Sequence, residues 1–182
     1  MHTNSYYKFF LFFLVLLSIS SFFAGFIYGE NSSGAGTFNG DFKHVWINLQ
    51  TFLNNNISDA FDLTFDSENY QSSRTPLIYI FHKLFNPLTE NKNHFLKSVF
   101  IISLLVPILF YYCLKQKFNK EDNLLLILIS STVLLSPYFR TSAYWGLEEN
   151  FGIISFLISF LFFYNFLKNN KNTSIIYIQL FF

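Results

Sequence analysis

The side chains best suited to chemistry lie in two stretches of this chain. Residues 29–95 form a long polar stretch that contains Asp41 and Arg74. Residues 136–150 form a shorter stretch that contains Arg140, Tyr144, Trp145, Glu148 and Glu149. A carboxylate can act as a general base or hold a divalent cation, and an arginine can donate paired hydrogen bonds to a phosphate. Tyr and Trp rings can stack against a sugar, so the two stretches together suit a substrate with a phosphate and a sugar.

Each of these residues also has a simpler structural explanation. Asp41 follows a glycine at the start of a helical pattern and could be the N-cap of that helix. Glu148 and Glu149 come directly before an apolar run, where the helix dipole favours negative charge. Arginine, tyrosine and tryptophan at the edges of apolar runs are often anchors at the membrane surface. The functional and the structural explanations both stay open at this point.

The elements that must position these residues are membrane spans. The 182 residues are 52% hydrophobic and only 13% charged, whereas soluble domains are about 25% charged, so membrane insertion is the first expectation. Apolar runs predict four spans, at residues 9–28, 99–114, 123–139 and 151–167. A cleaved signal peptide is the alternative for the first run, although its apolar core exceeds the usual length of about 7–15 residues. The predicted fold is all-α, a polytopic transmembrane helical protein.

A fifth apolar run begins at residue 174 and reaches the last residue of the sequence, 182. It is too short to cross a bilayer. The 182 residues are therefore expected to be the N-terminal part of a longer protein.

Two amphipathic segments occur within the first polar stretch. In residues 42–53 the apolar side chains repeat at helical spacing, as they do in residues 76–85 after a Thr75–Pro76 start. The two stripes comprise Phe42, Val45, Trp46, Leu49, Phe52 and Leu53, and Leu77, Ile80, Phe81, Leu84 and Phe85. Such helices are expected to lie along the membrane surface with the apolar face in lipid, which would hold Asp41 at the boundary between water and lipid.

The basic residues of the short loops set the expected orientation. Lys8, the group Lys115, Lys117 and Lys120, and the pair Lys168 and Lys171 fall on one side if the four spans alternate. The positive-inside bias makes that side cytoplasmic, so the N-terminus is expected inside. Both polar stretches, residues 29–95 and 136–150, then face outward together.

This layout resembles the GT-C glycosyltransferases, polytopic enzymes that take a sugar from a polyprenyl-phosphate carrier. Members of that family have one span, then a long outward loop with an acidic residue near its start and two surface-lying helices, then more spans. Asp41 and the segments 42–53 and 76–85 match this order, and Glu148 or Glu149 matches the acidic residues of a second outward loop. The run from Arg140 to Asn150 also looks like that loop in bacterial mannosyltransferase-like proteins.

The resemblance implies a membrane glycosyltransferase of the bacterial inner membrane, acting at the cell envelope on a glycan, lipid or protein acceptor. Asp41 would be the catalytic base, Arg140 and Arg74 would bind the phosphate, and Glu148 or Glu149 would bind the acceptor or a cation. No cofactor is firmly implied, although a divalent cation would suit the carboxylates. The competing classes are an O-antigen polymerase or ligase and a non-catalytic integral membrane protein. A net charge of +1 gives no argument for nucleic acid as a partner.

Overall fold

The chain is all-helical, with no strand, over the residues that the structure, a computed structural model, describes: 5–30, 38–65 and 76–169. The helices follow one another as α1 (Ser5–Ile27), α2 (Phe38–Asn54), α3 (Ile57–Leu63), α4 (Leu77–Phe85), α5 (Lys92–Ser103), α6 (Leu105–Lys117), α7 (Asn123–Ser131), the 3-10 turn η1 (Thr132–Leu135), α8 (Pro137–Trp145) and α9 (Glu149–Asn169). The predicted all-α class is thereby confirmed for this part of the chain.

Within the described residues, three helical segments are long and apolar enough to cross a membrane: Ser5–Ile27, Lys92–Lys117 and Glu149–Lys168. The first and third correspond to the spans predicted at 9–28 and 151–167, and the second contains the span predicted at 99–114. The remaining predicted span, 123–139, corresponds to α7 and η1, which end at Leu135 and are followed by α8 after a bend of 65°. This pair makes a fourth span only if it crosses as one broken helix. The run 174–182 lies outside the described residues.

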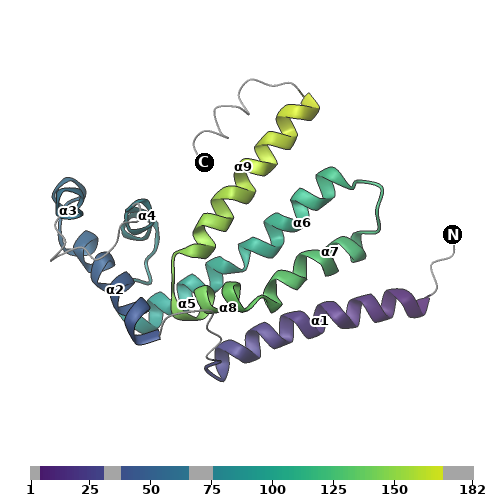
Figure 1. Cartoon of the computed structure of the whole chain (residues 1–182), viewed down its shortest axis with the longest axis horizontal. Coiled ribbons are helices and arrows are strands. Elements are labelled where there is room, and N and C mark those ends of the chain that lie inside the picture. Colours follow the sequence, from purple (N-terminus) through teal and green to yellow (C-terminus); the bar gives the residue numbers. More distant parts are fainter. Residues whose placement is uncertain (1–4, 31–37, 66–75, 170–182) are drawn as a thin grey trace.

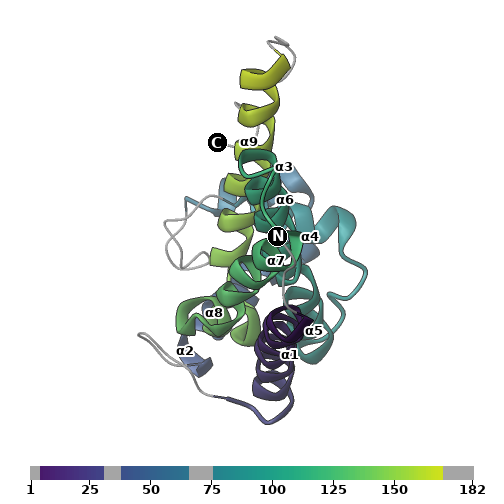
Figure 2. The same cartoon turned by 90° about the vertical axis from the view of Figure 1, so that its right-hand side faces the viewer.

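The long helices form a single layer (Figures 1 and 2). Neighbours in this layer are α1 with α7, α7 with α6, and α6 with α9. A single layer cannot bury both faces of its helices, and large apolar side chains stay exposed along them, including Phe9, Phe13, Ile108, Phe156 and Leu167. Exposed apolar side chains of this size on long, mostly apolar helices are what a lipid environment accommodates, and the structure agrees with an integral membrane protein.

The two polar stretches meet at one end of this layer. Figure 1 shows the C-terminal end of α1 together with α2, α4, α8 and the start of α9 on the left, while the N-terminus and the connection from α6 to α7 lie on the right. The basic residues Lys115 and Lys117 fall in the last turn of α6, at the opposite end from α8. Residues far apart in the sequence are therefore brought together at one end of the molecule.

Proline and glycine residues explain where several helices break. The long second segment is interrupted at Leu104, three residues before Pro107, because proline lacks the N–H that would bond to Ser103 and its ring crowds that carbonyl. Pro137 occupies the first turn of α8, where its missing N–H costs nothing. Gly146 ends α8 with φ of +68°, a left-handed conformation that glycine adopts readily.

The two amphipathic segments both form helices, but α2 buries its apolar face whereas α4 buries its polar face. In α2 the predicted stripe is turned inward, with Phe42, Val45, Leu49 and Phe52 all buried against protein, so this stripe does not lie in lipid as predicted. In α4 the predicted stripe is turned outward, and Phe85 is 70% exposed. The physical reason is that α2 packs against α3, α4 and α8, which supply an apolar surface inside the protein.

Candidate functional site

Arg140 is the most buried charged residue in the described part of the chain, and α8 carries it there. The segment 136–150 was expected to be a loop, but Pro137–Trp145 is a helix that packs against α2, α5 and α9 and is hydrogen-bonded to α1. Its residues from Phe139 to Trp145 are all buried. Arg140 is 8% exposed. A buried guanidinium must be paired and hydrogen-bonded to be tolerated, so its partners define the site.

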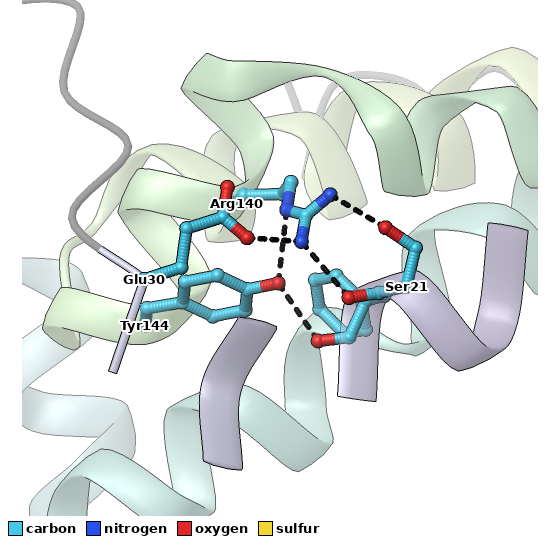
Figure 3. A network of polar contacts seen from close by, with 5 residues as sticks. Ser21, Glu30, Arg140 and Tyr144 are labelled. Carbon is cyan, nitrogen blue, oxygen red and sulfur yellow. Dashed lines mark hydrogen bonds and ion pairs between the residues drawn. The ribbon is translucent and has the colours of Figure 1, made fainter. Parts of the chain in front are cut away.

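The guanidinium of Arg140 is held by the C-terminal part of α1 and by α8 itself (Figure 3). Its Nε donates to the Tyr144 hydroxyl at 3.0 Å, and its Nη1 and Nη2 donate to the Oγ and carbonyl oxygen of Ser21 at 3.1 and 2.9 Å. Nη2 also forms an ion pair with the carboxylate of Glu30. The Tyr144 hydroxyl in turn donates to the carbonyl of Phe22 at 2.7 Å. The network ties two segments that are more than 100 residues apart in the sequence.

Gly25 makes this approach to α1 sterically feasible. A Cβ built on Gly25 would lie closer than 3.0 Å to three atoms of the network: Nη2 of Arg140, Oε2 of Glu30 and the hydroxyl of Tyr144. Real Cβ atoms essentially never show such separations. Small residues let helices approach closely in membranes, and here the absent side chain leaves room for an ion pair. Gly25, Ser21 and Glu30 were not predicted as site residues, although Ser21 and Gly25 stand out as small residues within an apolar span.

A second polar cluster joins the start of α9 to α2 and α4. The hydroxyl of Tyr79, which is fully buried, donates to a carboxylate oxygen of Glu148 and accepts from the amide of Asn48 at 3.3 Å. Glu149 accepts from the hydroxyl of Ser142 at 3.2 Å. Both predicted carboxylates are therefore held by protein side chains, and Glu149 also lies in the first turn of α9, where the helix dipole favours it.

Asp41 lies in the first turn of α2, which begins at Phe38, so it is not the N-cap that the sequence allowed. Its side chain is half-buried. The ring of the next residue, Phe42, packs against the turn after α8. A Cβ added to Gly146 in that turn would lie only 3.3 Å from this ring. Glu148 is two residues beyond that glycine, so Asp41 and Glu148 belong to segments that meet at this contact.

The two predicted aromatic residues are part of the protein interior. Tyr144 is buried between α1 and α5, with ring centroids 5.3 Å from Phe22 and 6.2 Å from Phe100. Trp145 is buried as well. Neither ring is presented at the surface in this conformation. Arg74 lies outside the described residues.

A third buried polar group, centred on His82 of α4, was not predicted. His82 is almost fully buried, and its Nδ1 accepts from the side-chain amide of Asn86 at 2.8 Å. The same amide donates to Ser98 at 2.8 Å, and the Asn86 carbonyl oxygen accepts from the backbone N–H of Leu88, which fixes the orientation of the amide. Burial lowers the pKa of His82 from 6.5 to about 4, so this imidazole is neutral at pH 7. It stabilises the position of α4 beside α5.

Within the described residues, no group of three or more His, Cys, Asp or Glu side chains is arranged to hold a metal ion. No protein-family model, curated protein or solved structure matches this chain. The groups available for chemistry at this end of the molecule are one buried guanidinium, the carboxylate of Glu30 that neutralises it, and three further carboxylates on converging segments, those of Asp41, Glu148 and Glu149.

Proposed function

We propose that this chain belongs to a GT-C-type membrane glycosyltransferase, which moves a sugar from a polyprenyl-phosphate carrier to an acceptor hydroxyl. The observation that carries the proposal is the convergence of α2, α8 and the start of α9 at one end of the helical layer (Figure 1). These elements carry Asp41, Arg140, Glu148 and Glu149, which lie on two separate stretches of the sequence. A transferase of this class needs a base for the acceptor and a cation for the leaving phosphate near one another.

In the proposed reaction, the acceptor oxygen forms a bond to the anomeric carbon of the sugar. The bond from that carbon to the phosphate oxygen breaks, and polyprenyl phosphate leaves with the electron pair. Asp41 takes the proton of the acceptor hydroxyl, and Arg140 stabilises the charge on the leaving phosphate. Glu148 or Glu149 orients the acceptor, with Tyr79 fixing the carboxylate of Glu148.

The proposed setting is the bacterial inner membrane with the N-terminus in the cytoplasm. In this arrangement α7 with η1 and α8 is the third of four spans, and α8 lies at the outer boundary. The outward stripe of α4, which includes Leu77, Leu84 and Phe85, lies in the outer interfacial region, as expected of an amphipathic surface helix. The lysines of the opposite end face the cytoplasm.

A non-catalytic role is the second candidate, because one observation favours it. The charged side chain of Arg140 is already neutralised by Glu30 and hydrogen-bonded to α1, which is also how a purely structural ion pair would be built. In that case the site would hold α8 against α1 and would do no chemistry.

An Asp41→Asn substitution in the intact protein tests the enzyme proposal. The amide cannot accept a proton, so we expect transfer from polyprenyl-phosphate-linked hexoses to fall by at least 100-fold with unchanged expression. Asp62→Asn is the matched control, since Asp62 is an exposed acidic residue on α3 in the same outward stretch. Activity of Asp41→Asn equal to that of Asp62→Asn would contradict the assignment of the base.

A further inference from the structure

The ion pair at the end of α1 is asymmetric in its exposure. The side chain of Arg140 is 9% exposed, whereas that of Glu30 is 36% exposed. The cation is thus enclosed by the protein, whereas the anion that pairs with it is partly open to the surroundings.

The anion is also the less firmly held partner. Glu30 comes after α1 and after Gly29, whose φ is +67°, and its backbone N–H bonds to the carbonyl of Gly25 at 2.8 Å. This bond keeps the backbone of Glu30 in place, while its carboxylate is held by Arg140 in the described part of the chain. A change of side-chain rotamer is enough to take the carboxylate away from Arg140 without moving α1.

Arg140, in contrast, is fixed by neutral groups that remain when Glu30 leaves. Its guanidinium has five N–H donors and donates four hydrogen bonds, and only the bond to Glu30 goes to a charged acceptor. One N–H of Nη1 has no acceptor among the described residues. Departure of Glu30 would therefore leave a positioned cation with free donors on both Nη1 and Nη2, the pair that binds two oxygens of a phosphate.

We propose that Glu30 occupies the place of an anionic ligand on Arg140, and that the phosphate group of a membrane lipid displaces it. This inference rests on the proposed function. It means that the ion pair with Glu30 blocks the phosphate site on Arg140 until the ligand binds. A buried cation without an anion is strongly disfavoured, so the carboxylate protects the resting site and the lipid phosphate replaces it on binding. The backbone of Gly25 borders the exchange site, because Nη2 of Arg140 and Oε2 of Glu30 both lie directly beside it.

The test uses the chain in phosphatidylcholine nanodiscs with undecaprenyl phosphate as the probe. Glu30→Gln keeps an oxygen that can accept from Nη2 but removes the competing charge, so we expect affinity for the probe to rise about tenfold. Arg140→Lys keeps the charge without the planar fork and is expected to lose most of the binding. Glu121→Gln is the matched control, because Glu121 is exposed in the connection from α6 to α7 and the substitution changes net charge equally.

A second measurement uses the unaltered protein. Carbodiimide coupling of an amine to carboxylates, read by mass spectrometry, is expected to increase at Glu30 when undecaprenyl phosphate is added, because the displaced carboxylate becomes accessible. Glu121 is expected to react equally with and without the probe. Replacing the probe by phosphatidylglycerol or by inorganic phosphate in the buffer identifies which source of phosphate the site accepts.

The outcomes separate the inference from the function on which it rests. Equal affinity of the wild type, Glu30→Gln and Glu121→Gln, with no change in the labelling of Glu30, would overturn the exchange but leave the glycosyltransferase proposal standing. No binding of undecaprenyl phosphate to any variant would overturn both. Tighter binding to Glu30→Gln together with increased labelling of Glu30 would support the exchange.

Discussion

A methyl group at Gly25 should break the Arg140 network. The added Cβ of Gly25→Ala would clash with Arg140, Glu30 and Tyr144 at once, since all three side chains have atoms closer than 3.0 Å to its position. These atoms are the ends of flexible side chains and can move away, but moving them separates the ion pair. Losing a buried pair costs about 3–5 kcal/mol. Because Glu30 is 36% exposed, solvent screening reduces this to about 3 kcal/mol.

The helix propensity of alanine offsets part of this loss, by about 1 kcal/mol relative to glycine. The net destabilisation is then about 2 kcal/mol, which corresponds to a fall in melting temperature of about 4–8 °C for a chain of this size. Thermal unfolding in detergent micelles, followed by intrinsic fluorescence, measures the shift. Gly152→Ala is the control, because a Cβ on Gly152 of α9 meets no atom within 4 Å and should leave stability equal or slightly higher. If Gly25→Ala is as stable as Gly152→Ala, the close packing of Arg140 over α1 is refuted.

Two further predictions concern the buried polar groups around α4. Tyr79→Phe removes the hydroxyl that holds Glu148, and we expect a loss of about 1–2 kcal/mol in the free energy of unfolding. The control is Tyr138→Phe, which removes an exposed hydroxyl and should cause no change in the same thermal melt. The lowered pKa of His82, about 4 against 6.5, means that the unfolded chain binds a proton that the folded chain does not between these pH values. Stability should therefore fall as the pH drops below 6.5, by up to about 3 kcal/mol at pH 4, and this part of the pH dependence should be absent from the melts of His82→Gln.

The long helices were predictable because their signal is local. Apolar runs of about the length that a bilayer requires identify α1 and α9 with little reference to the rest of the chain. The break in the second segment was predictable for the same reason, since Pro107 disrupts the helix wherever it occurs. The bounds of the helices differ from the prediction because hydrophobicity does not fix where N-capping residues such as Asn91 and Asp122 begin a helix.

The helix α8 was missed because its stability is not local. Its sequence mixes polar and aromatic residues without a clear apolar face, and it is held by burial between α1, α2 and α5. Local signals were present at its ends, with Pro137 in the first turn and Gly146 just beyond the last. Those two residues predict a short helix, but they do not predict that the helix is buried.

In the candidate site, too, residue types could be recognised from the sequence, whereas the contacts between distant residues could not. Arg140 was selected from its residue type, but its partners Ser21 and Glu30 lie 119 and 110 residues away, a proximity that spacing along the chain cannot reveal. Which face of α4 is buried likewise depends on groups that are distant in the sequence. Tyr79 and His82 are turned inward by hydrogen bonds to Glu148 and Asn86, so the polar side of the helix is buried and its apolar stripe points outward.

The most direct test of the central claim is the release of undecaprenyl phosphate from its hexose-linked form by the intact protein in nanodiscs, with an acceptor extract from the same membranes. We expect release that depends on the acceptor, that is lost in Asp41→Asn and that is retained in Asp62→Asn. Release that is absent from the wild type with every donor sugar tried, or that is unchanged in Asp41→Asn, would contradict it. The first result would favour a structural role for the Arg140 network.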